Sequence, residues 1–165
     1  NLRVLVAPPP VGAQPRLRVV DGGLLVQTPD EGWEEEWRPV TERAPTEDES
    51  AAMRLAWRVA KHAPSNAVVA ASATATVGIG AGQPSRVDSC RIAVEKARAA
   101  GLSLAGTAAG SDAFFPFPDG VEALAAAGVT AIAQPGGSVR DDDVIAAANR
   151  LRLAMVFTGR RHFRH

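Results

Sequence analysis

The chain has 165 residues, which corresponds to about one domain, and 46% of them are hydrophobic. A domain of this size and composition buries a core without disulfide bonds or a structural metal. Its 18 basic and 18 acidic residues cancel, so no overall charge favours nucleic acid or an anionic membrane as a partner. The single cysteine, Cys90, excludes an internal disulfide and fits a reducing cytoplasm, which is the expected location. No apolar run approaches the roughly 20 residues that a membrane span requires.

The first 45 residues predict short strands. Apolar and basic residues alternate in segments 2–6 and 16–20, as they do in half-buried strands, and a third candidate strand covers residues 22–28. The chain opens at Asn1, without an initiator methionine and directly in the first of these segments. We therefore expect that it is a fragment whose upstream part is missing.

A helix is predicted to begin after Thr46. Thr46 can cap this helix, and Glu49, three residues later, completes a capping box. Pro64 ends the helix because proline cannot continue the hydrogen-bond ladder. The apolar face of the helix comprises Ala52, Leu55, Ala56 and Val59.

Strands and helices alternate from residue 66 onward. The predicted strands cover residues 66–70, 76–82, 103–106, 129–134 and 153–157, and the predicted helices cover residues 84–100, 121–128 and 141–150. Such alternation predicts an α/β sandwich with a mostly parallel sheet. The glycines at 78, 80 and 82 do not fit the spacing of a dinucleotide-binding loop, because position 83 is Gln. We expect instead that they let the backbone of their strand pass close to a neighbour.

Three connections between strands and helices have unusual compositions: residues 80–86, 111–120 and 134–142. Ligands of open α/β sheets bind outside the carboxyl ends of the strands, where such loops gather. The middle loop, SDAFFPFPDG, holds three of the five Phe residues, and its two prolines exclude a regular helix or strand. The sequence therefore predicts a ligand site built from these loops.

Two familiar catalytic arrangements are not found. Ser111 and Asp112 lack the G-x-S-x-G elbow of a hydrolase. The zinc deaminase signature, H-x-E with P-C-x-x-C, is also missing. We therefore expect neither a nucleophilic serine nor a bound metal.

Five segments in order carry a resemblance to a known family: SNAVV, GIGAGQPSRVDSCRIA, SDAFFPFPDG, AIAQPGGSVRDDDVI and MVFTGRRHFRH. They closely resemble the family of bifunctional purine biosynthesis enzymes that join aminoimidazole carboxamide ribonucleotide (AICAR) formyltransferase to IMP cyclohydrolase. The resemblance covers essentially the whole chain. It implies a three-layer α-β-α sandwich with a cytidine deaminase-like fold that lacks the zinc site.

The resemblance also implies an activity and a domain organisation. The transformylase region moves a formyl group from 10-formyltetrahydrofolate, the co-substrate, to AICAR in IMP biosynthesis, and it contains two deaminase-like units. Residues 1–45 would form the end of the first unit with connecting strands, and residues 46–165 would form the second. The family acts as a homodimer with shared active sites. Its catalytic Lys-His pair and cyclohydrolase domain are expected upstream of Asn1, so the chain alone should bind ligands weakly and catalyse little.

By their match to the family's motifs, Asn66 and His165 are expected to be catalytic. Asn66 would contact the transferring formyl group, and His165 would lie next to the Lys-His pair. The expected nucleotide-binding residues are Asn66, Arg86, Phe114, Arg161 and Phe163. Within this set, Arg86 would contact the nucleotide near its carboxamide and Arg161 would bind its phosphate.

The expected folate-binding residues are Val87, Pro116, Phe117, Asp119, Ser138 and Val139. Asp119 would accept hydrogen bonds from the amino-pyrimidine ring of the folate. Phe115 falls between the two sets and is expected in the core. The family commonly has Arg where this chain has Pro118, which puts the charge at the folate entrance in question. The alternative hypothesis is a freestanding nucleotide- or folate-binding module without catalysis.

Overall fold

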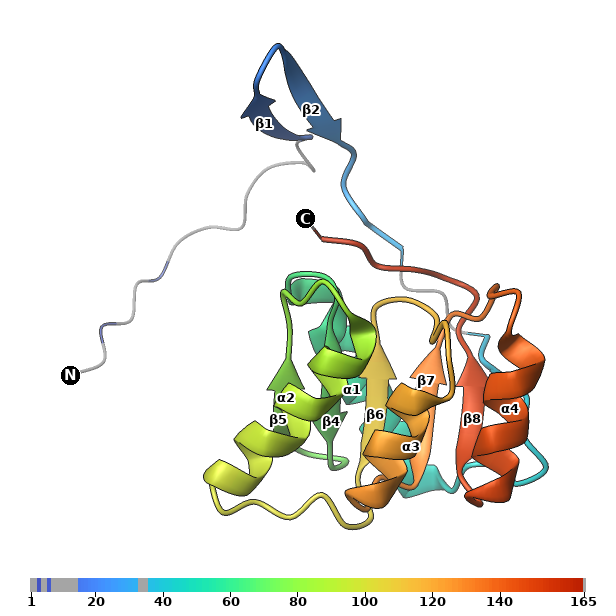
Figure 1. The fold of residues 1–165 in the computed structure, drawn as a ribbon. Helices are drawn as coiled ribbons and strands as arrows, with labels where there is room; N and C mark the ends of the chain where they lie inside the picture. Colours follow the sequence, from blue (N-terminus) through green and yellow to red (C-terminus); the bar gives the residue numbers. More distant parts are fainter. Residues whose placement is uncertain (1–2, 4–5, 7–14, 33–35, 165) are drawn as a thin grey trace. The chain divides into compact units, whose positions relative to one another are not determined.

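The computed structural model describes residues 3, 6, 15–32 and 36–164 (Figure 1). Contacts within the chain divide it into two units, residues 1–33 and residues 34–165. The strand predicted at residues 2–6 falls largely outside the described residues. Among the described residues, no helix combines the length and apolar character needed to cross a membrane.

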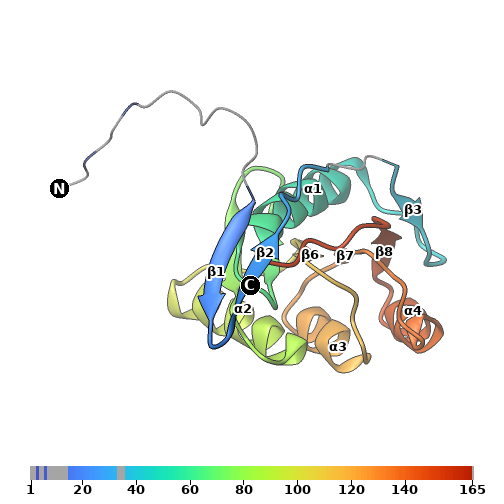
Figure 2. The same cartoon turned by 90° about the horizontal axis from the view of Figure 1, so that it is seen from above.

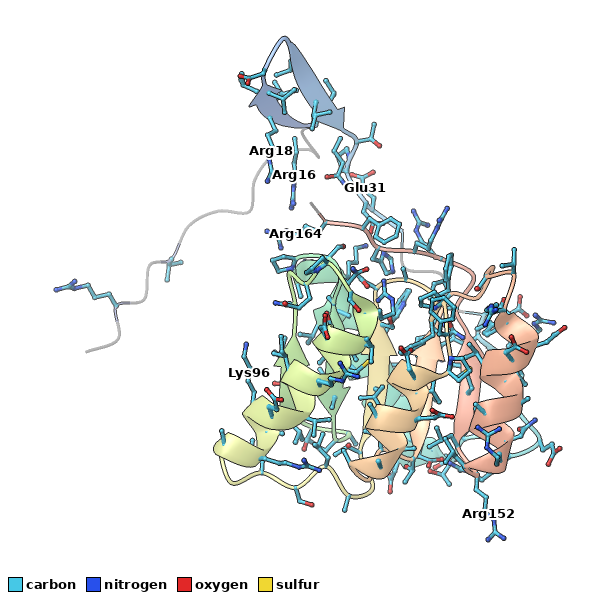
Figure 3. All side chains as sticks on the ribbon, in the orientation of Figure 1. Arg16, Arg18, Glu31, Lys96, Arg152 and Arg164 are labelled. Carbon is cyan, nitrogen blue, oxygen red and sulfur yellow. The ribbon has the colours of Figure 1, made fainter. Side chains whose placement is uncertain are left out.

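The first unit contains an antiparallel hairpin, which confirms the strands predicted at residues 16–20 and 22–28. Strands β1 (Arg16–Val20) and β2 (Gly23–Gln27) are joined by Asp21 and Gly22, and Gly22 has a φ of 76°. An Asp-Gly pair suits this tight turn because the turn requires positive φ. One face of the hairpin is apolar and exposed, with cross-strand pairs Leu17–Val26 and Val19–Leu24. Arg16 and Arg18 extend from the other face of β1 (Figure 3).

The second unit is built on a six-stranded mixed sheet. In spatial order its strands are β3 (Arg38–Pro39), β8 (Ala154–Phe157), β7 (Ala131–Gln134), β6 (Ala108–Ser111), β4 (Val68–Ala71) and β5 (Thr76–Gly80). The pairs β6–β7 and β7–β8 are parallel, whereas β3–β8, β4–β5 and β4–β6 are antiparallel. The prediction of a mostly parallel sheet was therefore wrong. A short turn at residues 72–75 joins β4 to β5, and only antiparallel strands can be connected so closely.

Helices cover both faces of this sheet, as the prediction of a three-layer α-β-α sandwich required (Figures 1 and 2). Helix α1 (Glu47–His62) lies on one face, and helices α2 (Arg86–Ala99), α3 (Asp119–Ala126) and α4 (Asp141–Arg150) lie on the other. Met53 and Trp57 of α1 pack against small residues of β6, β7 and β8. On the opposite face, α2, α3 and α4 share a core with Ile132 and Met155.

The strand predicted at residues 103–106 was wrong, because the strand in this region is β6, which begins five residues later. Leu104 is buried in a turn, which explains the misleading apolar signal. The four residues of β6 are Ala, Ala, Gly and Ser, which carry little strand propensity. Their small size has a packing reason, since a Cβ on Gly110 would lie 2.3 Å from the backbone nitrogen of Trp57 in α1.

The interpretation of the glycines is confirmed for Gly78 and Gly80 in β5, but it was wrong for Gly82, which follows the strand with a φ of 71° and whose Cβ would meet nothing closer than 3.8 Å. A Cβ on Gly78 would lie 2.2 Å from the carbonyl oxygen of Ala93, and one on Gly80 would lie 1.8 Å from that of Ser89. Both oxygens belong to the backbone of α2, so neither can move aside alone. The glycines therefore let α2 lie directly on β5.

Replacing Gly80 with alanine should destabilise the second unit by about 3 kcal/mol or more, because α2 must move away from β5. Gly23→Ala is the control, since its Cβ would meet nothing closer than 3.9 Å, and it should change stability by less than about 0.5 kcal/mol. Urea unfolding measures both. Equal stability of the Gly80→Ala variant and the unaltered chain would contradict the close packing.

The start of α1 confirms the predicted capping box. The Thr46 hydroxyl accepts from the Glu49 backbone N–H at 3.2 Å, and the Glu49 carboxylate accepts from the Thr46 backbone N–H at 2.9 Å. Arg43 adds a two-pronged contact, with Nη1 and Nη2 at 2.7 and 2.8 Å from the two carboxylate oxygens of Glu49. Burial raises the pKa of Glu49, but its hydrogen bonds with Arg43 and Thr46 outweigh burial and lower the pKa to about 2.

Glu49 should therefore make stability depend on pH in the acid range. A lowered carboxyl pKa stabilises the fold above its ordinary value of 4.5, and this contribution is lost as the pH falls toward about 2. The lowering corresponds to about 3 kcal/mol at neutral pH. The difference in unfolding free energy between the unaltered chain and Glu49→Gln should shrink across this window. Glu47→Gln, at an exposed position of the same turn, should show no such trend.

Candidate functional site

One edge of the six-stranded sheet gathers the three loops that the sequence singled out. The carboxyl ends of β5, β6, β7 and β8 and the amino end of β4 lie at this edge, and the C-terminal segment runs along it (Figure 1). The Ser65 backbone N–H donates to Arg164 O, and the Arg164 N–H donates to Ser65 Oγ, both at 2.9 Å. Figure 3 shows Arg164 here and Arg152 at the opposite edge. Arg164 is therefore held against the segment in front of β4.

A cleft of about 370 Å³ lies at this edge. Eight residues predicted for the site line it: Asn66, Arg86, Val87, Phe114, Pro116, Phe117, Asp119 and Phe163. Pro84, Ser85 and Ala113 complete the lining. Four segments of the chain thus converge: the start of β4, the start of α2, the loop after β6 and the C-terminal segment. Two of the three predicted loops, residues 80–86 and 111–120, contribute to the lining, and residues 134–142 do not.

Arg86 is the first residue of α2 and is buried beside the cleft. Its Nη1 lies 2.5 Å from Asp112 Oδ1 and 2.7 Å from Ser111 Oγ, and its Nη2 lies 2.8 Å from Asn66 Oδ1. The side chain of Asp112 is fully buried. The guanidinium is therefore held mainly by three side chains of the protein. The predicted contact of Arg86 with the nucleotide did not take these partners into account.

Asn66 precedes β4 and is fixed at both ends of its side chain. Its Oδ1 accepts from Arg86, and its Nδ2 donates to Gln83 O at 2.8 Å. Its backbone N–H donates to the same Gln83 oxygen at 3.1 Å, and its carbonyl accepts from Ser89 Oγ at 2.8 Å. The Nδ2 group has a second hydrogen, so the fixed amide can still donate to a ligand in the cleft.

Aromatic rings form much of the cleft wall. Phe114 is half-buried, whereas Phe117 and Phe163 are 49% and 39% exposed. Exposed rings in a concave site favour a flat, partly apolar ligand. Phe115 is 1% exposed, which confirms its predicted place in the core.

Asp119 supplies a carboxylate to the cleft. It is the first residue of α3, and its Oδ1 accepts from the Gly120 backbone N–H at 2.8 Å. The side chain is exposed and lines the cleft. A second carboxylate oxygen can therefore accept from donors on a ligand.

Neither Ser111 nor Cys90 is arranged as a nucleophile. The Ser111 hydroxyl donates to Ala113 O at 2.7 Å and accepts from Arg86. Burial raises the pKa of the Cys90 thiol to about 12, so almost no thiolate exists at neutral pH. The described residues of the cleft are therefore suited to binding and orienting ligands.

Four predicted site residues do not appear in the lining of the cleft. Arg161 is exposed, and its guanidinium carbon lies 5.7 Å from the centre of the Phe163 ring. Ser138 Oγ accepts from the Arg140 N–H at 3.1 Å just before α4, and Val139 is fully exposed. His165 lies outside the described residues. These four assignments stay predictions.

Sequence reasoning did not assign Asp112 or Arg140 to the site. Asp112 immediately follows β6, a position at the ligand-binding edge of the sheet that could have indicated it. Arg140 is at the start of α4, and its guanidinium carbon lies 5.1 Å from the centre of the Phe117 ring. No sequence signal pairs Asp112 with Arg86 or Arg140 with Phe117, because the two partners of each contact are far apart in the chain.

Comparison with known proteins identifies the family. The model of the family described as AICARFT/IMPCHase bienzyme matches residues 1–96, more than half of the chain. The chain belongs to this family. The resemblance recognised in the sequence is thus confirmed at the level of the AICARFT/IMPCHase family.

Individual members of the AICARFT/IMPCHase family are closely similar over the whole chain or most of it. The chain is 61% identical to the bifunctional purine biosynthesis protein PurH of Chloroflexus aurantiacus, across all of this chain and 33% of that protein. It is 56% identical to PurH of Paracoccus denitrificans, across all of this chain and 34% of that protein. It is 58% identical to PurH of Acidithiobacillus ferrooxidans, across 88% of this chain and 28% of that protein. The chain spans about a third of the length of these curated relatives.

Replacing Arg86 with methionine should destabilise the second unit by about 3–5 kcal/mol, because it leaves the buried carboxylate of Asp112 without its cation. Arg91→Met is the control, since the Arg91–Asp88 pair on α2 is exposed and 3.4 Å long, and it should cost less than about 1 kcal/mol. Denaturant unfolding measures both variants. Similar losses of unfolding free energy in the two variants would contradict the claim that burial makes the Arg86–Asp112 pair more important than the exposed Arg91–Asp88 pair.

Proposed function

We propose that this chain forms part of the AICAR formyltransferase site of its protein and serves purine biosynthesis. The proposal assigns residues 46–165 to the second deaminase-like unit of the transformylase region and residues 1–45 to the end of the first with connecting strands, of which β3 joins the sheet of residues 46–165 by pairing with β8. The observation that carries it is the cleft in which Asn66, Arg86, Phe114, Phe117 and Asp119 converge. The names of the PurH relatives support the pathway.

The chemistry of the cleft suits formyl transfer. The exocyclic amine of AICAR is a weak nucleophile because its lone pair is delocalised into the imidazole and carboxamide. Transfer therefore needs orientation of the two substrates, a proton acceptor, and a donor near the oxygen that gains negative charge. A fixed Asn66 amide can supply the donor at the formyl oxygen. The described lining residues include no lysine or histidine, so we assign proton transfer to groups outside this set, His165 among them.

We divide the cleft between two ligands. Phe114 and Phe163 would hold the nucleotide, with Arg161 on its phosphate. Phe117, Pro116 and Val87 would hold the folate, with Asp119 accepting from its ring. Ser138 and Val139 would contact the folate from the turn before α4, and the contact of Arg140 with Phe117 supports the proximity of that turn to the cleft. A second copy of the protein is the proposed partner, as the resemblance implies.

Formyl transfer by the protein made from its complete coding sequence tests the function. We expect transfer from 10-formyltetrahydrofolate to AICAR, and a loss of roughly 100-fold or more in kcat for Asn66→Ala. Binding of both ligands without transfer would favour the freestanding binding module. Ring closure to IMP that depends on these residues, without formyl transfer, would assign the chain to the cyclohydrolase instead.

Two substitutions should separate the ligands. Arg161→Ala should weaken AICAR binding roughly tenfold, because a charge-assisted bond to phosphate is lost, and should leave folate binding within about twofold. Phe117→Ala should give the opposite pattern, because it removes the exposed ring assigned to the folate. Isothermal titration calorimetry with AICAR and 10-formyltetrahydrofolate measures both, with Arg91→Ala as a surface control. The reverse pattern would overturn the division of the cleft.

A further inference from the structure

Asp112 is held by several segments of the second unit. Its backbone N–H donates to Ala67 O at 3.1 Å, and its backbone carbonyl accepts from the His162 N–H at 2.8 Å. Its side chain is fully buried, and Oδ1 lies 2.5 Å from Arg86 Nη1. Asp112 is therefore fixed through its backbone to the residue before β4 and to the C-terminal segment, and through its carboxylate to α2.

In each hydrogen bond of the series that leads from Asp112 through Arg86 and Asn66 to Gln83, only one assignment of donor and acceptor is possible. A guanidinium only donates, so Arg86 Nη1 donates to Asp112 and to Ser111 Oγ, whose own hydrogen is directed to Ala113 O. Arg86 Nη2 must likewise face an acceptor, which is Asn66 Oδ1. The Gln83 carbonyl can only accept, so the amide nitrogen of Asn66 faces it.

This series determines what Asn66 can offer to a ligand. Its oxygen faces the cation, and one of its two amide hydrogens is used by Gln83 O. The second amide hydrogen is the donor that remains at the cleft. If the carboxamide turned over, its NH₂ group would face a guanidinium and its oxygen would face a carbonyl, and both contacts would be lost.

We propose that Asp112 is a positioning residue for formyl transfer: it holds Arg86, and through Arg86 it holds the Asn66 amide as a hydrogen-bond donor toward an oxygen of the ligand. The proposal rests on the function proposed above. A donor fixed before the reaction is most effective where negative charge develops, because no reorganisation is needed during transfer.

Stability alone gives a weak reason for this arrangement. Buried ion pairs are often no more stabilising than apolar residues of similar volume, because both charges lose their water. The contact between α2 and the sheet is already made by apolar residues such as Cys90 and Val94. The branched contact of Arg86 with Asp112, Ser111 and Asn66 adds orientation, which that packing does not supply.

The experiment uses the protein made from its complete coding sequence and measures kcat and both KM values for formyl transfer. Arg86→Lys keeps a cation next to Asp112, but one ammonium cannot reproduce the planar fork that reaches both Asp112 and Asn66. It should lower kcat roughly 100-fold, while both KM values stay within about threefold and the thermal unfolding midpoint shifts by a few degrees. Asp88→Asn, in the exposed pair on α2, is the matched control and should leave kcat unchanged.

A double-substitution cycle tests whether Asp112 acts through Asn66. Asp112→Asn alone should lower kcat at least about tenfold, but in a protein that already carries Asn66→Ala it should lower kcat less than about twofold. If Asp112 had a purely structural role, the fold losses in kcat caused by Asp112→Asn and by Asn66→Ala would multiply in the double variant.

Several results would overturn the proposal. They are multiplying losses in the cycle, an unchanged kcat in Arg86→Lys, or failure of both Arg86→Lys and Asp112→Asn to fold. Each would leave formyl transfer by the unaltered protein intact. Absence of transfer in the unaltered protein would instead refute the proposed function, and with it the role of Asp112 in that reaction.

Discussion

The buried contact between Arg86 and Asp112 is the constraint on which the cleft depends. It joins the first residue of α2 to the residue that follows β6, and through Arg86 it reaches Asn66 in front of β4. The backbone of Asp112 also accepts from His162 in the C-terminal segment. Two charges removed from water cannot separate without a large desolvation cost. The segments that carry the cleft residues are therefore held in one arrangement.

Small residues in the sheet make this arrangement possible. Gly110 in β6 lets the backbone of α1 come close on one face, and Gly78 and Gly80 in β5 do the same for α2 on the other. Because α2 lies so close to the sheet, its first residue, Arg86, reaches the buried carboxylate of Asp112. The sheet and its helices thus provide a rigid base, and the loops at one edge carry the chemistry, as is common in α/β proteins.

Local signals along the chain predicted many of the elements well. The capping box at Thr46 and Glu49 predicted the start of α1, and the helix predicted at residues 141–150 matches α4. Prediction failed where the signal is not local. The strand β6 consists of small residues because the backbone of α1 packs closely against Gly110. The direction of β4 depends on its neighbours in the sheet.

The sequence by itself determined the family, the helices, the capping box of α1 and two of the loops that line the cleft, because motifs, periodicity and proline and glycine positions are all local properties. Only the tertiary structure decided which partner each charged group takes. Arg86 and Asp112 are 26 residues apart, and nothing along the chain distinguishes their pairing from a surface arginine and an exposed carboxylate. Strand order, the close approach of α2 and burial together create that pair, and these are non-local consequences of packing.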